Sequence, residues 1–585
     1  MKKAARRRCK VAAATAFALM LALAAVLAEP AHSVTALEMA VQPLGNPLPP
    51  PPPAASTPNQ ALIDFLQHPV GVVVGGIATL GSGVAMTWAL LSHWRHPAET
   101  GMRRRERGRR EHRRADGDGT AVRNRGTATA LLGATLAAGV FLLPLVFSIA
   151  FDDVFAMPKS WLLWLLAGIT LVLMVAAALR GERPVRIGFV ELFAGAFLLF
   201  NLGATVVAED QAHAVIGERL QYQGLLSTAA YVVLFLAARH AFAASQHVRA
   251  LSWALLASAV VAAGYGLAQW VGLDPLWSQL FKGRIFSTMG QANWLAALLA
   301  TALVMTIPLA GGRSMLARLS LAVAAVGIVL ALFLTFGRGG YLGLVAGAVL
   351  AGAVLLRGLA RTSVRRLAPR AAVGVTATVL VIIALAALWQ PAGDLAGRVT
   401  ERVAVIADPN ESSNRIRLDL WAVAAAVTSD HPLTGTGPDS YVLVFPDYRD
   451  VVLAPDRAAN LAKFRPESPH NVYLAVASGA GLPALAALVA LIGSAFWLGA
   501  RAAWGPLDRE NRLALAGLLG GSLVITLTNG FMTGDPATSA IWFVVLGATI
   551  SLSSTILSPA PPVTRQTEED ASQPRASRRR GRRRG

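Results

Sequence analysis

A few polar residues stand where long apolar segments begin or end, and they carry the chemistry of this sequence. Arg284, Asn293, Arg338 and His470 all occupy such positions. An arginine deep in a bilayer costs about 2.5–3.5 kcal/mol on insertion scales, so it usually has a partner or lines a wet cavity. Arginine binds phosphate oxygens bidentately, and histidine can take a proton from a hydroxyl near neutral pH. The set therefore suits an anionic substrate and a single general base.

Each of these residues also has a plain structural alternative. Arg338 would be an interfacial arginine that extends its head group to water. Asn293 would be a helix cap, and His470 would be only the polar start of a helix. The functional interpretation gains weight because the arginines and the histidine are expected on the same side of a membrane.

Several chemistries are excluded by missing motifs. The sequence has no phosphate-binding Walker loop, no GxSxG nucleophile turn and no metal-ligand spacing. Its single cysteine, Cys9, allows neither an intrachain disulfide nor a cysteine-based metal site. We therefore expect neither ATP hydrolysis nor serine hydrolysis, and we expect no metal and no cofactor.

The elements that must position these residues are membrane-spanning helices. The chain has 585 residues, of which 54% are hydrophobic and only 15% charged, and its mean hydropathy is +0.52. The sequence contains many long apolar blocks with few charged residues. Such blocks cross a bilayer as helices, since a barrel would show short alternating segments. We predict an all-α integral membrane protein with a core of about twelve spans. The predicted spans are 127–149, 160–179, 187–208, 224–242, 250–272, 291–310, 316–336, 339–356, 371–390, 470–498, 512–530 and 536–557.

The loops between these spans alternate in charge. Five carry most of the loop arginine: 180–186, 239–249, 311–318, 357–370 and 499–512. The intervening loops 151–160, 209–223 and 530–535 are acidic or nearly neutral. Because basic loops stay in the cytoplasm, the alternation predicts that the near-neutral loops and His470 are external.

The formal net charge of +20 is concentrated in short runs near the N-terminus, at 103–125, at 357–370 and in the tail 575–584. No aromatic residues are interleaved with these runs, so we expect anchoring at membrane lipid head groups and no nucleic-acid binding. The predicted organisation is a signal-like or anchor segment 1–28, a Pro-rich external linker 29–69, an extra span 70–92, an Arg-rich cytoplasmic linker 93–126, core spans 127–390, an external loop 391–469, core spans 470–557 and a basic tail 558–585.

The loop 391–469, between the ninth and tenth spans, is unusually long and is therefore expected to be functional. Within it, Ile416, Leu420, Val423 and Val427 recur at helical spacing, which predicts an amphipathic helix. The histidine, proline and glycines at 431–438 would end that helix.

From about 127 to 557 the chain resembles the family of O-antigen ligases and their polymerase relatives. Three stretches carry the resemblance, and their order and spacing make it specific: Phe286–Trp294 with its G-x-x-N pattern, the Arg-Gly turn in Thr335–Leu342 (with Gly337 in place of the usual Ser), and the run of Arg-x-x-x-Trp at 417–421, His-Pro-Leu-x-Gly-x-Gly at 431–437, His-Asn-x-x-Leu at 470–474 and Gly-Leu-Pro at 481–483. The resemblance implies a polytopic glycosyltransferase fold of the GT-C-like kind in the bacterial cytoplasmic membrane.

The resemblance also implies a reaction and roles for residues. The family transfers a glycan from an undecaprenyl-diphosphate carrier to an acceptor hydroxyl, outside the membrane and without metal. Arg338 and Arg417 would bind the diphosphate, with Arg284 beside them, and His470 would be the base. Arg415 competes with Arg417 for its role.

Two further residues are candidates for substrate contact, namely Asn293 and Asn471, from the same motifs. Ser478-Gly479 stands where many family members have Glu-Gly, so the contribution of that carboxylate is missing here. The donor would be a lipid-linked glycan, and the acceptor a glycan, a lipid or a protein. Whether the enzyme ligates a finished chain or polymerises repeat units stays open.

Two rival classes remain. A transporter of a small anion such as bicarbonate would need charged residues through both leaflets, whereas the polar residues here gather on the external side. A membrane scaffold would leave the arginines and His470 unexplained.

Overall fold

The computed structural model describes residues 127–180, 188–274, 283–311, 315–357, 412–463 and 466–558. Within these ranges every regular element is helical. The elements are α5 (Thr127–Leu142), α6 (Ala156–Leu179), α7 (Phe189–Val207), α8 (Gln211–Ile216), α9 (Leu225–Ala241), α10 (Ser245–Trp270), η2 (Ser287–Met289), α11 (Ala292–Val304), η3 (Ile307–Gly311), α12 (Met315–Leu334), α13 (Arg338–Leu356), α16 (Ser412–Asp430), α17 (Tyr441–Val452), α18 (Pro455–Leu461), α19 (Val472–Trp504), α20 (Arg509–Thr528) and α21 (Pro536–Leu557).

The described part of the chain has nine helices that are long and apolar enough to cross a membrane, and α5 and α9 are shorter apolar helices. These helices occupy eleven of the twelve predicted spans. The predicted ninth span, 371–390, lies outside the described residues, as do the N-terminal segments up to 126 and the basic tail. The prediction of an all-α, multi-pass membrane protein is confirmed.

The bundle has central and peripheral helices. In its most apolar stretch, 78% of α21 is buried, compared with 17% of α12. Glycines let the central helices approach closely, as where α13 packs on α20. A Cβ atom on Gly347 would lie 2.5 Å from the side chain of Val524 and 2.7 Å from the carbonyl oxygen of Gly520. Larger residues here would force these two helices apart.

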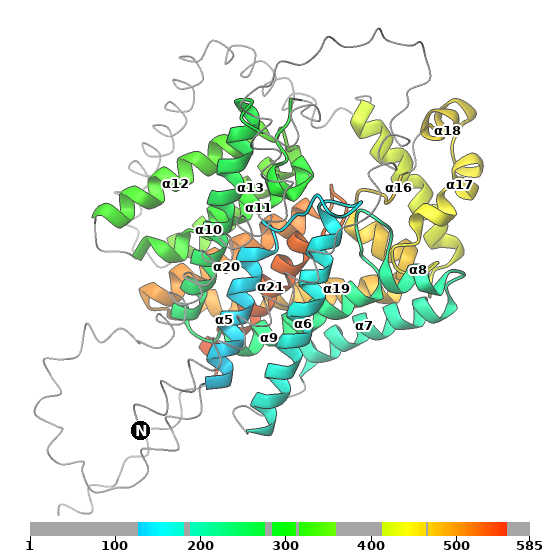
Figure 1. Ribbon diagram of the computed structural model, residues 1–585. Helices are drawn as coiled ribbons and strands as arrows, with labels where there is room; N and C mark the ends of the chain where they lie inside the picture. The colour runs from blue at the N-terminus through cyan, green and yellow to red at the C-terminus, as the bar shows by residue number, and fades with distance from the viewer. Residues whose placement is uncertain are drawn as a thin grey trace, which may run out of the picture.

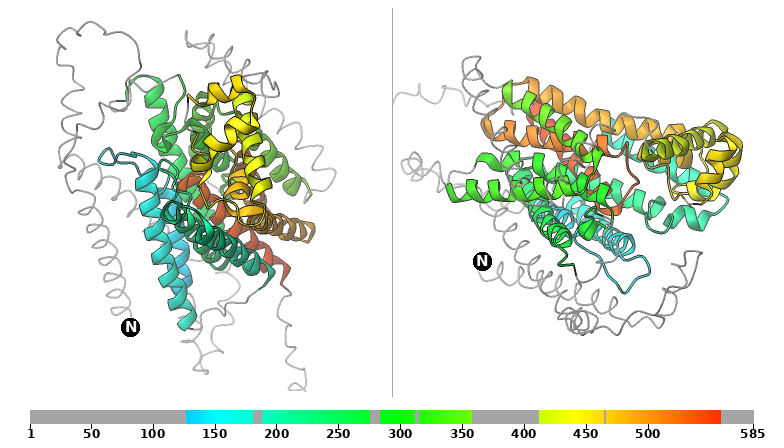
Figure 2. Two further views of the ribbon diagram at one scale, coloured as in Figure 1. Left: turned by 90° about the vertical axis from the view of Figure 1, so that its right-hand side faces the viewer. Right: turned by 90° about the horizontal axis from the view of Figure 1, so that it is seen from above.

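Helices α16, α17 and α18 form a cap at one end of the bundle (Figures 1 and 2). They enclose a small apolar cluster of their own, which includes Leu420, Val423 and Val427 from the predicted amphipathic segment. An ion pair joins Arg457 of α18 to the buried Asp419 of α16. The cap is therefore a packed unit rather than a structureless loop.

The cap is joined to the bundle through a break in α19. Gly481 interrupts the helix with φ 81°, and the loop 431–440 pairs with the exposed backbone. The amide of Leu482 donates to the carbonyl oxygen of Pro432 at 2.8 Å, and the amide of Gly437 donates to the carbonyl oxygen of Gly479 at 2.8 Å. A Cβ atom on Gly481 would lie 2.4 Å from the carbonyl oxygen of Leu433. The glycines of this motif therefore serve close backbone contact.

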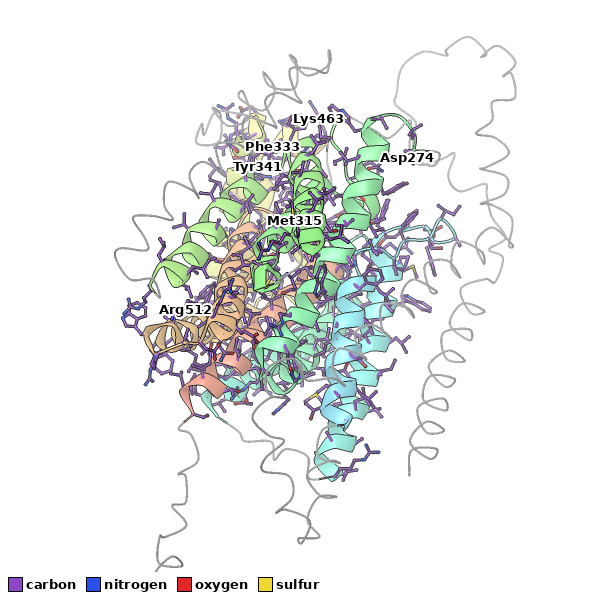
Figure 3. The ribbon with its side chains drawn as sticks, turned by 90° about the vertical axis from the view of Figure 1, so that its left-hand side faces the viewer. Asp274, Met315, Phe333, Tyr341, Lys463 and Arg512 are labelled. Carbon is purple, nitrogen blue, oxygen red and sulfur yellow. The ribbon has the colours of Figure 1, made fainter. Side chains whose placement is uncertain are left out.

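The two ends of the bundle differ in what they carry. Asp274, Tyr341 and Lys463 lie at the end that bears the cap, and Arg512 lies towards the other (Figure 3). We call these the cap end and the opposite end. The loop 209–223, which is predicted to be external, is hydrogen-bonded at the cap end to Asp439.

Candidate functional site

A pocket at the cap end brings together three of the predicted arginines. It measures about 450 Å³, counting the open solvent at its mouth. Its lining residues are Arg284, Asn293, Phe336, Arg338, Gly339, Gly340, Ser413, Arg417, Thr528, Phe531 and Met532. None of these described lining residues is acidic, and three of them are arginines.

Arg284 is held in a fixed orientation by its neighbours. Its Nε donates to the carbonyl oxygen of Thr335 at 2.8 Å, and its Nη2 donates to Oδ1 of Asn293 at 3.1 Å. Asn293 is the second residue of α11, and the N-cap of that helix is Gln291. Asn293 therefore orients an arginine and does not cap the helix.

Arg338 begins α13 directly after a strained turn. Phe336 has a φ of 47°, which non-glycine residues rarely adopt. A Cβ atom on Gly337 or Gly340 would lie 2.6 or 2.7 Å from Cβ of Ala296, so the start of α13 lies tightly against α11. This contact places Arg338 next to Asn293 and Arg284.

Helix α16 distinguishes the two candidate arginines of the cap. Arg417 lines the pocket, whereas Arg415 is exposed and is not among the lining residues. Trp421, one helical turn beyond Arg417, donates from Nε1 to the carbonyl of Pro469 at 2.9 Å. Its ring centroid lies 6.5 Å from that of Phe531 in the pocket wall. Trp421 thus connects the pocket to the residue before His470.

His470 stands just outside the pocket and is not one of its lining residues. Its backbone has a φ of 51°, and its amide donates to Oγ of Ser468 at 3.2 Å. Burial, followed by the positive charge of Arg417, lowers the pKa of His470 to about 4. The imidazole is therefore neutral at pH 7 and able to accept a proton.

The neighbouring Asn471 caps α19. Its Oδ1 accepts from the amides of Tyr473 at 3.0 Å and Leu474 at 3.1 Å, which is the usual geometry of an N-cap. The next amide, that of Val472, donates to the carbonyl of Asn529 at 2.9 Å. These bonds fix where α19 begins, and hence the place of His470.

Backbone strain is concentrated at the cap end. The non-glycine residues with positive φ among those described are Leu220, Tyr222, Ser287, Phe336, Asp439 and His470. Leu220, Tyr222 and Asp439 lie in the predicted external loops 209–223 and 391–469, Ser287 lies between two predicted spans, and Phe336 and His470 lie at the ends of predicted spans. Strained residues persist only where the surrounding contacts hold them, and they often gather at functional sites.

The loop between α8 and α9 is fastened to the cap by one carboxylate. Oδ2 of Asp439 accepts from the amides of Glu218 at 2.7 Å and Gln223 at 2.9 Å. Burial raises the pKa of Asp439 to about 7, against the effect of these two hydrogen bonds. Nε2 of Gln221 donates to Glu467 at 3.3 Å, three residues before His470. The loop therefore borders the segment that carries the histidine.

The sequence reasoning missed several residues around the pocket. It gave no role to Trp421 or to the carbonyl of Thr335, and it overlooked two buried charges, Lys159 and Asp535. A signal for the charges was present, since both lie at the edge of a long apolar segment. In the described part of the chain no group of three His, Cys, Asp or Glu side chains could hold a metal ion.

Comparison with protein families supplies the context of this site. Residues 320–489 match the family model described as O-Antigen ligase. This match relates the segment 320–489 to the O-antigen ligase family. The matched segment includes Arg338, Arg417 and His470, while Arg284 and Asn293 lie before it. No curated protein matches the chain.

Proposed function

We propose that this protein is a glycosyltransferase that moves a glycan from an undecaprenyl-diphosphate carrier to an acceptor hydroxyl at the cap end, on the external face of the bacterial cytoplasmic membrane. One observation carries the proposal: Arg284, Arg338 and Arg417 converge on one pocket beside a neutral histidine. The family match supports the class of reaction.

The pocket suits the head group of such a carrier. Arginine forks bind phosphate oxygens bidentately and stay charged, so they can stabilise a diphosphate that leaves with its full negative charge. Phe531 and Met532 line the same pocket and give it an apolar wall. A positive site with an apolar wall fits a carrier that has an anionic head and a hydrocarbon tail.

His470 supplies the other half of the reaction. The acceptor oxygen attacks the anomeric carbon while its proton passes to the imidazole, and the bond between that carbon and the diphosphate oxygen breaks. With a pKa of about 4, His470 is a weak base in the free protein. A bound diphosphate would offset the charge of Arg417 and so raise the pKa of His470. Donor binding would then activate the base.

The test uses the purified protein in vesicles with a lipid-linked donor and an acceptor. A positioned base contributes about 10²–10⁴-fold, so His470→Gln should lower turnover by that order and leave donor binding nearly intact. His431→Gln is the matched control, because His431 is an exposed histidine of the same cap. A wild-type rate for His470→Gln would return His470 to the role of a helix start.

The same assay separates a ligase from a polymerase. A ligase adds one preformed chain to a lipid, protein or glycan acceptor and gives a single shifted product. A polymerase uses the growing chain as a substrate and gives a ladder. The residues around the pocket serve either outcome, since both reactions use the same leaving group.

A further inference from the structure

A lysine lies fully buried near the cap end of α6. The side chain of Lys159 has no solvent exposure, and its Nζ donates to the carbonyl oxygens of Thr288 at 2.9 Å and Phe155 at 3.2 Å. A buried ammonium group is costly unless it is paired and hydrogen-bonded. The burial of this lysine therefore calls for a structural explanation. Lys159 is not among the residues that line the arginine pocket.

Two buried carboxylates, Asp535 and Asp153, act on this charge through space without forming an ion pair with Lys159. Asp535 is fully buried and caps α21, where its Oδ2 accepts from the amide of Thr538 at 2.8 Å. Its Oδ1 has no hydrogen-bond partner among the described residues. Asp535 therefore caps α21 and also acts on Lys159 through space, without a direct hydrogen bond or ion pair between the two.

Both charges belong to the framework of the arginine pocket. Thr288, which accepts from Lys159, lies in the segment 283–293 that carries Arg284 and Asn293. Asp535 ends the loop 529–535 that carries Phe531 and Met532.

The two segments are also joined directly. Nε1 of Trp294 donates to the carbonyl of Thr533 at 3.1 Å. Gly290, in the first segment, packs so closely on α6 that a Cβ atom would lie 2.4 Å from the ring of Phe155. Lys159 thus lies where α6 supports both walls of the pocket.

We propose that Lys159, balanced by Asp535, is a positioning residue for the diphosphate pocket. Its ammonium group fixes the turn at Thr288 through a charge-assisted hydrogen bond, and so sets the place of Arg284 and Asn293. Asp535 stabilises the ammonium group of Lys159 electrostatically and anchors the loop 529–535, which forms the opposite wall of the pocket. The inference rests on the proposed function, because Lys159 and Asp535 position a binding site only if the arginine pocket binds an anionic head group.

The test separates positioning from simple stability. Removing one partner of a buried pair leaves the other charge uncompensated and is strongly destabilising, whereas replacing both is often tolerated. Lys159→Met and Asp535→Asn should each lower the unfolding temperature in detergent, and the double variant should recover most of the loss. The double variant should still bind undecaprenyl diphosphate about tenfold more weakly, a change of about 1.4 kcal/mol. Its KM for the donor should rise while kcat changes less.

A matched control removes a pair at the opposite end. Arg239 and Glu191 form a partly buried ion pair there, and Arg239→Met with Glu191→Gln should leave undecaprenyl diphosphate binding unchanged. A double variant of Lys159 and Asp535 that is stable and binds like the wild type would overturn the proposal.

A second variant keeps the proposal testable if Lys159→Met does not insert. Lys159→Arg retains the charge opposite Asp535, but its larger planar group cannot occupy the place of the ammonium between two carbonyls. It should fold and bind undecaprenyl diphosphate several-fold more weakly, and wild-type affinity would again refute the role. If the wild-type protein itself does not bind undecaprenyl diphosphate, the proposed function fails and not the positioning inference alone.

Discussion

Arginines at the two ends of the bundle are used in different ways. At the opposite end they meet partners that neutralise or cover them: Arg239 pairs with Glu191, Arg249 lies 3.2 Å from a carboxylate oxygen of Glu510, and the guanidinium of Arg357 lies 4.1 Å from the ring centroid of Trp504. At the cap end Arg284, Arg338 and Arg417 share a pocket, and no acidic side chain is among its described lining residues.

The difference follows from what each end needs. Anchoring arginines lower their energy by pairing with carboxylates, stacking on aromatic rings or reaching lipid head groups. The proposed role of the pocket arginines requires instead that they be held in a fixed orientation. A backbone carbonyl and a side-chain amide oxygen orient Arg284 in this way. The residue type is the same at both ends, and the partners decide the use.

The first prediction tests which end faces outwards, and its effect is all or none. In a Cys9→Ser background, Val451→Cys on α17 should react with an impermeant thiol reagent added to intact spheroplasts. Asp508→Cys, just before α20, should react only after the membrane is opened. Both positions are exposed, so reactivity reports sidedness and not burial. The reverse pattern would place the arginine pocket in the cytoplasm and remove the basis for external transfer.

The second prediction contrasts the two arginine sets directly. Well-made hydrogen bonds to a charged group are worth about 1.5–3 kcal/mol each, so Arg338→Ala or Arg417→Ala should weaken donor binding by about ten- to a hundredfold. Lysine lacks the fork and should rescue only partly. Arg357→Ala, at the opposite end, should leave donor binding unchanged. Equal binding by all three alanine variants would mean that the pocket does not hold the diphosphate.

Much of the bundle could be predicted from the sequence. Hydropathy places helices because only a long apolar segment with internal hydrogen bonds is stable in lipid. The same logic made Arg338 and His470 stand out, since charged and titratable groups at the ends of such segments are rare. The alternating arginine content of the loops then placed Arg284, Arg338 and His470 on one predicted side.

The partners of these residues could not be predicted. From the sequence, Asn293 could be interpreted as a helix cap, yet it orients Arg284, which lies before the start of α11. Arg415 and Arg417 are equivalent by composition, and only the packing of α16 shows which one faces the pocket. Lys159 lies at the edge of an apolar stretch, and one of its two carbonyl partners, Thr288, is 129 residues away in sequence. Such contacts depend on how distant segments pack, which periodicity and composition do not encode.

The last prediction is a shift in the pH profile. His470 has a pKa of about 4 because burial and the positive charge of Arg417 both oppose its protonation. If His470 is the base, as proposed, it is unprotonated above about pH 4 in the free protein, and kcat/KM should fall as the pH drops through that value. Arg417→Gln removes the repulsion but not the burial. The pKa of His470 should then rise, and the acid limb of kcat/KM should move to higher pH, though not beyond the ordinary value of about 6.5.

The shape of the profile carries this test, because Arg417→Gln also lowers the rate through weaker donor binding. Arg415→Gln is the control: Arg415 is on the same helix and carries the same charge, but it is exposed and does not line the pocket. Its acid limb should stay where the wild type has it. An unmoved limb in Arg417→Gln, or an equal shift in both variants, would show that Arg417 does not act on the base. The pocket and His470 would then be separate sites, and the proposed activation of the base by the bound diphosphate would fail with them.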